Sequence, residues 1–226
     1  MPSESLARTV SNATWLSLSH RRRVRESIHV TASVHDRVDA TIDDLVQRAR
    51  DADLGEPDCK AGCWYCCQIR VHVTVPEVVR VARYVLDHFD TEEIRELVDR
   101  LHAYRAQLSG LDRAAYFETR LRCPLNVAGA CSVHPARPIV CRRYLSYDVN
   151  RCIEHFVDNQ PSQIPKLDAI GAAVEPYLSG LANGAVRANE PSLVNFPHAL
   201  AVALTGDNLD RWQRGARVFH DCAARA

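Results

Sequence analysis

Four of the nine cysteines in this chain stand in one short stretch, CKAGCWYCC, at residues 59–67. Three residues separate Cys59 from Cys63, two separate Cys63 from Cys66, and Cys67 follows directly. Loops this short bring neighbouring thiols together at little entropic cost. Thiolates that converge in this way are ligands of zinc and of iron-sulfur clusters. The stretch therefore predicts one part of a metal site.

A second group follows in the segment 122–152, which has three prolines, one glycine and no sustained periodicity; its members are Cys123, Cys131, Cys141 and Cys152. Such a segment is expected to be rich in loops and to need an external staple. Cys66 and Cys67 are adjacent and project differently, so one of them can leave the first group and reach toward the second. We expect the two segments to complete one or two metal sites. The distant Cys222 is expected to be a buried thiol outside them.

The setting of the cysteines argues against disulfide bonds. The N-terminal stretch lacks the apolar core of a signal peptide, and no later stretch is long and apolar enough for a membrane helix. We therefore expect a cytosolic protein, in which thiols stay reduced and serve as metal ligands.

The charge of the chain gives no sign of a nucleic-acid or membrane partner. Basic and acidic residues number 28 each. The basic run HRRRVR at 20–25 has no aromatic platform beside it and is interpreted as a solvated helix face. A metal ion or cluster is the partner that the sequence indicates, and no protein partner can be named from it.

The identity of the metal stays open between iron-sulfur and zinc, because both centres accept four thiolates. Only the loop from Cys63 to Cys66 has the two-residue length typical of zinc fingers, so the uneven spacing favours iron-sulfur. Cationic side chains near the cysteines suit the negative charge of either centre, and ordinary surface charge explains them equally well: Lys60, Arg70, Arg137, Arg142 and Arg143. We expect the nearby aromatic side chains to shield the metal from solvent: Trp64, Tyr65 and Tyr144.

Two enzyme classes are disfavoured by context. The spacing Cys59-x3-Cys63-x2-Cys66 resembles the cluster motif of radical S-adenosylmethionine enzymes, in which three thiolates hold a four-iron cluster. A polar helix is predicted before the motif, no strand and helix alternation follows it, and no G-x-G motif is present. A hydrolase triad is not indicated either, because His72 and His102 have no serine or aspartate partner at a motif spacing.

The cysteine segment as a whole resembles the YkgJ-type cysteine-cluster proteins, described as a zinc- or iron-chelating domain. The resemblance rests on CKAGCWYCC followed by CPL at 123–125 and CSVHPARPIVCRRY at 131–144, and it covers residues 59–152. It implies metal binding through eight cysteines: Cys59, Cys63, Cys66, Cys67, Cys123, Cys131, Cys141 and Cys152. Some relatives are associated with methylating lysines of flagellin.

Two histidines near the cysteines are further ligand candidates. Where many relatives have tyrosine, this chain has His134, in a Cys-x2-His spacing that Cys152 and His155 repeat. Eight thiolates already suffice for two four-ligand centres, so we expect both histidines to be turn or surface residues.

The rest of the chain is predicted to be mainly α, with helices around a loop-rich, cysteine-stapled metal-binding core and little β structure. Helical periodicity is found over 35–52, 76–89, 90–110, 164–184 and 196–226, and one short β-like run over 69–75. We expect an N-terminal helical extension (1–55), a cysteine-cluster domain (56–158) and a C-terminal helical extension (159–226), joined in one compact unit.

These patterns predict a metal-binding protein that holds an iron-sulfur cluster or zinc and has a redox, metal-handling or sensing role. Two alternatives stay open. One is an S-adenosylmethionine-dependent enzyme similar to protein-lysine methylases, and the other is a zinc-stapled interaction module.

Overall fold

The computed structural model describes residues 2–19, 23–60 and 62–224, and α-helices account for most of them. The helices are α1 (Pro2–Ser19), α2 (Arg23–Asp51), α3 (Val75–His88), α4 (Thr91–Leu108), α5 (Arg113–Glu118), α6 (Ile139–Arg142), α7 (Val149–Phe156), α8 (Asp168–Arg187), α9 (Phe196–Leu204) and α10 (Asn208–Gln213). Short 3-10 turns are η1 (Tyr65–Gln68), η2 (His134–Ala136) and η3 (His220–Cys222). The predicted mainly α class is confirmed.

The strands are short and pair in antiparallel fashion. β1 (His72–Val73) pairs with β4 (Val194–Asn195), and β2 (Asn126–Val127) pairs with β3 (Ala130–Cys131). Both ladders are two residues long, so they fix local chain crossings rather than form a sheet core. No parallel strand pair is found among the described residues.

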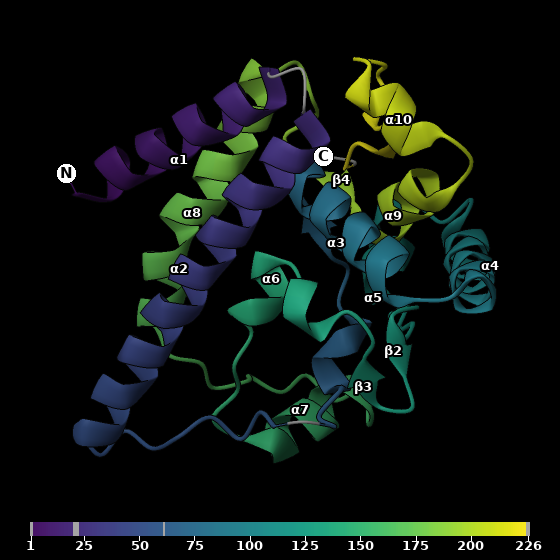
Figure 1. Cartoon of the computed structure of the whole chain (residues 1–226). Coiled ribbons are helices and arrows are strands. Elements are labelled where there is room, and N and C mark those ends of the chain that lie inside the picture. The colour runs from purple at the N-terminus through teal and green to yellow at the C-terminus, as the bar shows by residue number, and fades with distance from the viewer. Residues whose placement is uncertain (1, 20–22, 61, 225–226) are drawn as a thin grey trace.

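The first and last thirds of the chain meet in a bundle of α1, α2 and α8 (Figure 1). The axes of α1 and α8 approach closely because glycines face α1. A Cβ at Gly180 would lie 2.6 Å from the Cβ of Val10, and one at Gly184 would lie 2.5 Å from the Cβ of Thr14. The apolar side chains of this bundle include Val38 of α2 and Leu181 of α8, both fully buried.

The main hydrophobic core lies between α3, α4, α9 and α10. α3 is held between α2 and α9, and α4 packs on α9. The largest fully buried side chains of this core include Trp212 and Phe219. α4 begins with a capping box, since Asp90 and Glu93 each accept the other's backbone N–H, at 2.9 and 2.8 Å.

The structure corrects three predicted boundaries. The helix expected over 35–52 begins earlier, at Arg23. Its first turns bury small polar residues such as Ser27 and Thr31, which an apolar periodicity does not detect. The strand expected over 69–75 is limited to His72–Val73, since α3 already begins at Val75. The region 196–226 is not one helix but α9, α10 and η3.

A buried ionic network joins the bundle to the cysteine segment. The Glu77 carboxylate on α3 accepts the Ile139 backbone N–H at 2.8 Å and lies 3.5 Å from His35 Nε2 on α2. Arg142 pairs with Asp39 of α2 and donates to two carbonyl oxygens of the loop before α6, each at 2.7 Å. His35, Glu77 and Arg142 are all buried. Because a buried charge is costly unless paired, this network fixes α6 against α2 and α3.

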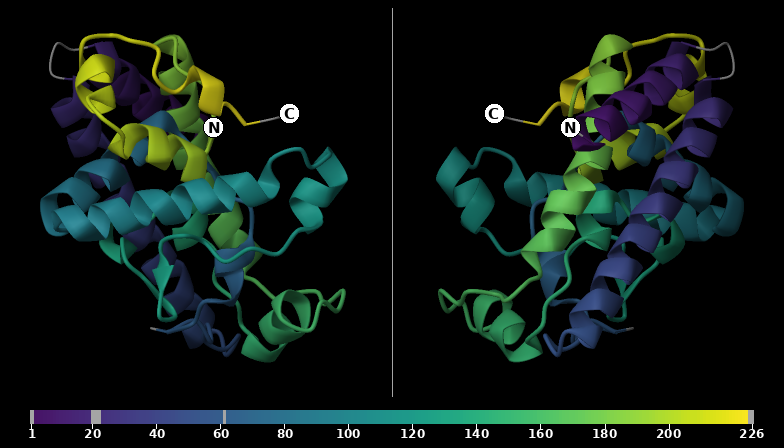
Figure 2. Two further views of the ribbon diagram at one scale, coloured as in Figure 1. Left: turned by 90° about the vertical axis from the view of Figure 1, so that its right-hand side faces the viewer. Right: turned by 90° about the vertical axis from the view of Figure 1, so that its left-hand side faces the viewer.

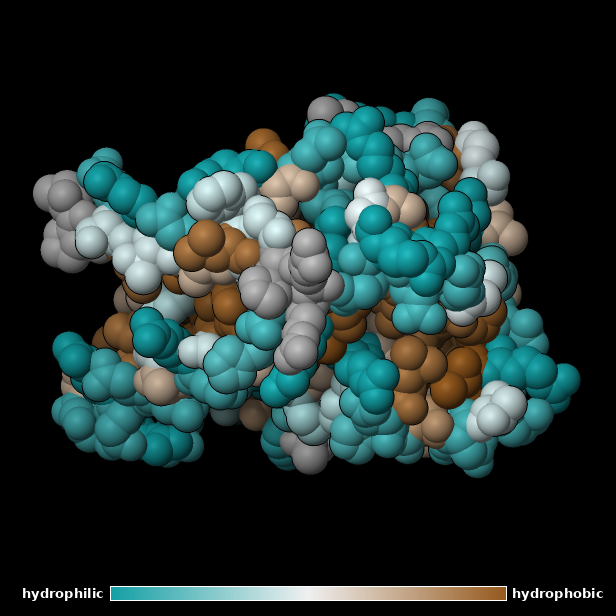
Figure 3. All heavy atoms as spheres, turned by 45° about the horizontal axis from the view of Figure 1, so that its top comes forward, coloured by the Kyte–Doolittle hydropathy of each residue, from teal (hydrophilic) through white to brown (hydrophobic). Residues whose placement is uncertain are grey.

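The surface is mostly hydrophilic on the face in Figure 3, with hydrophobic residues mainly in hollows. No described helix has the length and apolar character needed to cross a membrane. The prediction of a solvated basic face at 20–25 is wrong for Arg23, which pairs with Glu190 and lies 4.0 Å over the Trp212 ring. His20, Arg21 and Arg22 lie outside the described residues.

Candidate metal centre

The two cysteine segments meet, as expected, at the end of the molecule away from α10 (Figures 1 and 2). The Cys123 backbone N–H donates to the Cys67 carbonyl oxygen at 2.7 Å, and the Asp58 N–H donates to the Ser146 carbonyl oxygen at 2.8 Å. The stretch 58–67 is thus held by the start of the second segment at one end and by its last part at the other.

Four thiols lie near the loops that precede α7. We call them the loop thiol group: Cys59, Cys63, Cys66 and Cys152. Burial raises the pKa of Cys59 and of Cys152, and the Cys63 thiol raises both further. The Cys152 thiol also raises the pKa of Cys59. Burial, followed by the charges of Cys66, Cys152 and Cys59, raises the pKa of the Tyr144 hydroxyl to about 12. This hydroxyl is therefore a neighbour of the loop thiol group.

The other four thiols lie against the main hydrophobic core. We call them the core thiol group: Cys67, Cys123, Cys131 and Cys141. Cys123 and Cys131 pack against that core. Burial raises the pKa of Cys123 to about 12, with Cys67 and Cys131 adding to the effect. Burial also raises the pKa of Cys141, and the thiols of Cys123, Cys131 and Cys67 raise it further.

The adjacent Cys66 and Cys67 both lie on η1, where the two groups meet. Successive side chains of a 3-10 helix point about 120° apart, since one turn takes three residues. The Cys66 thiol donates to Cys67, which raises the pKa of Cys66 and lowers that of Cys67 to about 7. Asn126 and Arg122 lower the pKa of Cys67 further. Cys141 of the core thiol group and Cys59 of the loop thiol group also raise the pKa of Cys66. Cys66 therefore has neighbours in both groups.

All nine cysteines are free thiols, and Cys222 is buried away from the two groups. The thiols are neighbours, but in the described part of the chain no three or more Cys, His, Asp or Glu side chains are set so that they could hold a metal ion. The donor chemistry fits a metal, since two sets of four thiols match two tetrathiolate centres. The side-chain placement is not that of a formed coordination shell.

The cationic side chains singled out in the sequence have mixed roles. Arg137 lowers the pKa of Cys131, and the Cys141 and Cys131 thiols act in turn on the pKa of Arg137, whereas Arg142 pairs with Asp39 in the buried network. Arg143 pairs with Glu175 on the surface. Arg122, which sequence reasoning missed, lies 3.8 Å over the Trp64 ring and acts on Cys67. Its position directly before Cys123 is the signal that could have pointed to it.

The two histidine candidates are placed beside arginines. His134 Nδ1 lies 3.0 Å from Arg137 Nη1, and His155 Nε2 lies 3.3 Å from Arg120 Nη2. No interaction joins either imidazole to a cysteine in the described residues. His155 Nδ1 is buried without a hydrogen-bond partner there.

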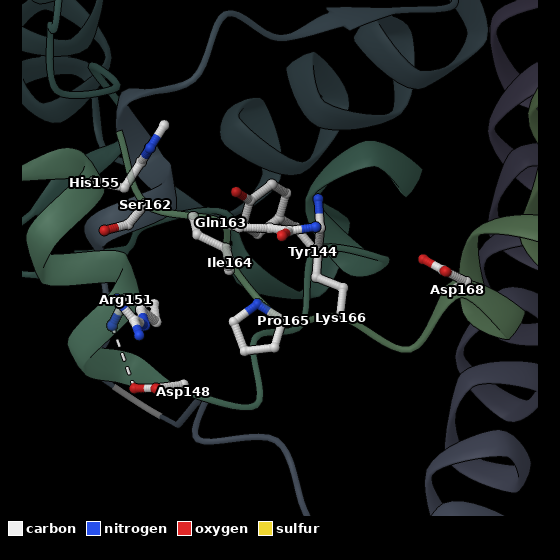
Figure 4. A pocket seen from close by; sticks show the side chains of 10 residues that line it. All are labelled: Tyr144, Asp148, Arg151, His155, Ser162, Gln163, Ile164, Pro165, Lys166 and Asp168. Atoms are coloured by element: carbon white, nitrogen blue, oxygen red, sulfur yellow. Dashed lines mark hydrogen bonds between the residues drawn. The ribbon is translucent and has the colours of Figure 1, made fainter. Parts of the chain in front are cut away.

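A hollow of about 670 Å³ is lined by Tyr144 and by α7, the helix that carries Cys152 of the loop thiol group. Figure 4 shows Tyr144 between the α7 side chains Arg151 and His155 and the segment that carries Pro165 and Lys166. The Lys166 ammonium lies 4.7 Å from the centre of the Tyr144 ring. The predicted shielding of the thiols by Tyr144 is therefore only partial, because this ring faces the hollow.

Comparison of the chain with family models, with curated proteins and with solved structures finds no match in any of the three.

Proposed function

We propose that this chain is a metal-binding protein whose eight cysteines form two four-thiolate centres, one from the loop thiol group and one from the core thiol group. The observation that carries the proposal is the gathering of the eight thiols, with Cys59, Cys63 and Cys152 near one another, Cys67, Cys123, Cys131 and Cys141 near one another, and Cys66 where the two sets meet. The resemblance of residues 59–152 to the YkgJ-type proteins supports the same ligand set.

The protonation of the thiols is consistent with this role. Burial raises the pKa of Cys59, Cys123 and Cys141, so without metal these side chains are neutral thiols at pH 7. A bound metal replaces those protons, and its binding free energy then adds to the stability of the fold. The metal would staple the two cysteine segments, which carry little secondary structure of their own.

Iron-sulfur is the first candidate for the centres and zinc is the second. The uneven cysteine spacing favours iron-sulfur, and the core thiol group is set against apolar side chains that would limit access of water to a cluster. An iron-sulfur pair would give the protein a redox or sensing role. Zinc would leave it a stapled interaction module.

The test is to purify the full chain under anaerobic and aerobic conditions and to measure iron, sulfide and zinc per chain, together with the visible spectrum. Iron and sulfide in equal amounts with broad visible absorption support the iron-sulfur form. A colourless protein with two zinc ions per chain overturns that form but keeps the two-centre proposal. A chain that retains no metal after anaerobic preparation overturns the proposal itself.

A further inference from the structure

A second cavity, of about 400 Å³, is lined by none of the eight cysteines in the two thiol groups and lies between four stretches that are distant in the sequence. Its floor is the β1–β4 ladder, where His72 faces Asn195. Its walls are the end of α4, one face of α5 with Arg113, Tyr116 and Phe117, the start of α9 and the residues around Cys222. Figure 2 shows α5 as a short helix beyond the far end of α4. The volume lies in the range of small-molecule sites.

The cavity has an aromatic wall that is open to solvent. The Phe117 side chain is 46% exposed, although its neighbour Tyr116 on α5 is held by hydrogen bonds. Its ring meets those of His72 and Tyr116 edge-on, with ring centres 6.3 and 5.1 Å apart. When a planar apolar group covers an exposed aromatic cluster in a concavity, apolar surface is removed from water and the free energy of the system falls.

The wall is held in place from behind by Arg70. Its Nη1 donates to the Tyr104 hydroxyl at 2.7 Å, and its Nε donates to the Tyr116 carbonyl oxygen at 3.0 Å. Asn195 Nδ2 donates to the Tyr116 hydroxyl at 2.5 Å. α4, α5 and the β1–β4 ladder are therefore tied together, and the cavity is formed before any ligand arrives.

Two arginines at this cavity, Arg105 and Arg113, have no ion-pair or hydrogen-bond partner within the chain as far as it is described. Arg105 is exposed and lines the cavity, and its charge lowers the pKa of both His198 and Cys222, whereas the Asp221 charge raises them. Of the two acidic residues nearby, Asp112 accepts the Ala115 N–H at the start of α5. The other, Asp221, is exposed.

The remaining polar groups make this a binding site rather than a reactive one. Burial lowers the pKa of His72 and of His198, so both rings are neutral at pH 7. Burial raises the pKa of Cys222 to about 11, so this side chain is a thiol and a poor nucleophile.

We propose that the cavity binds a small aromatic carboxylate, with its ring against Phe117, His72 and Tyr116 and its carboxylate paired with Arg105. An arginine without a partner is suited to a carboxylate because the guanidinium matches its geometry with two parallel hydrogen bonds. This site uses none of the eight cysteines assigned to metal. Its test is therefore independent of the test of the proposed metal centres.

The test uses the full chain, prepared anaerobically, and calorimetric titration with 3-phenylpropionate and its neutral amide as probes. We expect the carboxylate to bind at least about tenfold more tightly than the amide, which corresponds to about 1.4 kcal/mol. Arg105→Gln should remove that difference. The control Arg95→Gln lies on the same helix but pairs with Glu92, and it should leave the difference unchanged.

A second variant separates the ring contact from the charge. Phe117→Ala should weaken both probes by a similar factor, since it removes wall area and no charge. Circular dichroism and metal content of each variant establish that the chain is folded. Equal binding of the carboxylate and the amide, an Arg105→Gln variant that still prefers the carboxylate, or no binding of either probe at millimolar concentration would each overturn the proposal.

Discussion

The loop thiol group and the core thiol group have the same ligand chemistry but different support. In the core group, Cys123 and Cys131 rest on the main hydrophobic core, and Cys141 lies two residues from Ile139, which Glu77 anchors. In the loop group, Cys59 is held by loop backbone, with the Ser146 N–H donating to its sulfur at 3.3 Å. Packing therefore positions much of the core group, whereas in the loop group Cys59 is held by hydrogen bonds between loops and Cys152 is buried on α7.

The difference predicts that the two proposed centres would depend on metal to different degrees. A structural metal contributes most where the surrounding chain cannot order itself by burying apolar surface. The loop group meets this condition, since the hollow at Tyr144 brings solvent to its edge. The core group would keep much of its arrangement from the packing of its neighbours.

The largest expected effect comes from removing the metal. Treatment with a strong chelator under anaerobic conditions should raise hydrogen exchange most in 56–68 and 143–158, because the loop group loses its staple. α8 should keep its protection, since its contacts with α1 and α2 are apolar and close. Exchange that rises equally in α8 and in the loops would show that the bundle also depends on the metal.

A smaller effect is expected from a change that disturbs the bundle and not the thiols. Gly180→Ala or Gly184→Ala places a methyl group within 2.6 and 2.5 Å of α1 side chains, which should lower the free energy of unfolding by about 1–3 kcal/mol each. Gly171→Ala is the matched control on the same helix, because nothing lies within 4 Å of its added Cβ. It should change stability by no more than about 1 kcal/mol, in the stabilising direction. Denaturant unfolding measures all three, and equal losses would refute the close helix contact.

The network that joins the two regions should give a pH dependence. Burial lowers the pKa of His35, and Arg80 and Arg142 lower it further, against the opposing effect of Glu77. Burial by itself raises the pKa of Glu77, but His35 and the Ile139 and Thr74 N–H groups outweigh it, so that pKa is lowered.

In both cases the unfolded chain binds more protons than the folded one, so stability falls as the pH is lowered. For His35 the loss begins near its ordinary pKa of about 6.5, and for Glu77 near about 4.3. His35→Gln should therefore lose less stability than the wild type between pH 7.5 and 5.5. His102→Gln, on the exposed face of α4, is the control and should follow the wild type. If stability falls with pH in the same way in the wild type and in both variants, His35 does not contribute to the pH dependence.

The starts of α3 and α4 could be predicted because proline, aspartate and glutamate at fixed positions determine a first helical turn. The pairing of α1 with α8 could not, since it depends on glycines and small polar residues that an apolar periodicity does not register. The meeting of the two cysteine segments was likewise predicted from the sequence, whereas the ligand role that the resemblance implies for the eight cysteines stays a prediction. The hydrogen bond between the Cys66 and Cys67 thiols could not be predicted, because it depends on the direction in which η1 turns.

The central claim, two centres from two thiol groups, is tested most directly by metal analysis of the Cys66→Ser and Cys67→Ser variants. Each should keep about half of the wild-type metal, and the remaining centres should differ in spectrum. Cys152→Ser should match Cys66→Ser, Cys131→Ser should match Cys67→Ser, and Cys222→Ser should keep the full content. Loss of all metal in both Cys66→Ser and Cys67→Ser, or identical remaining spectra in the two, would contradict the account.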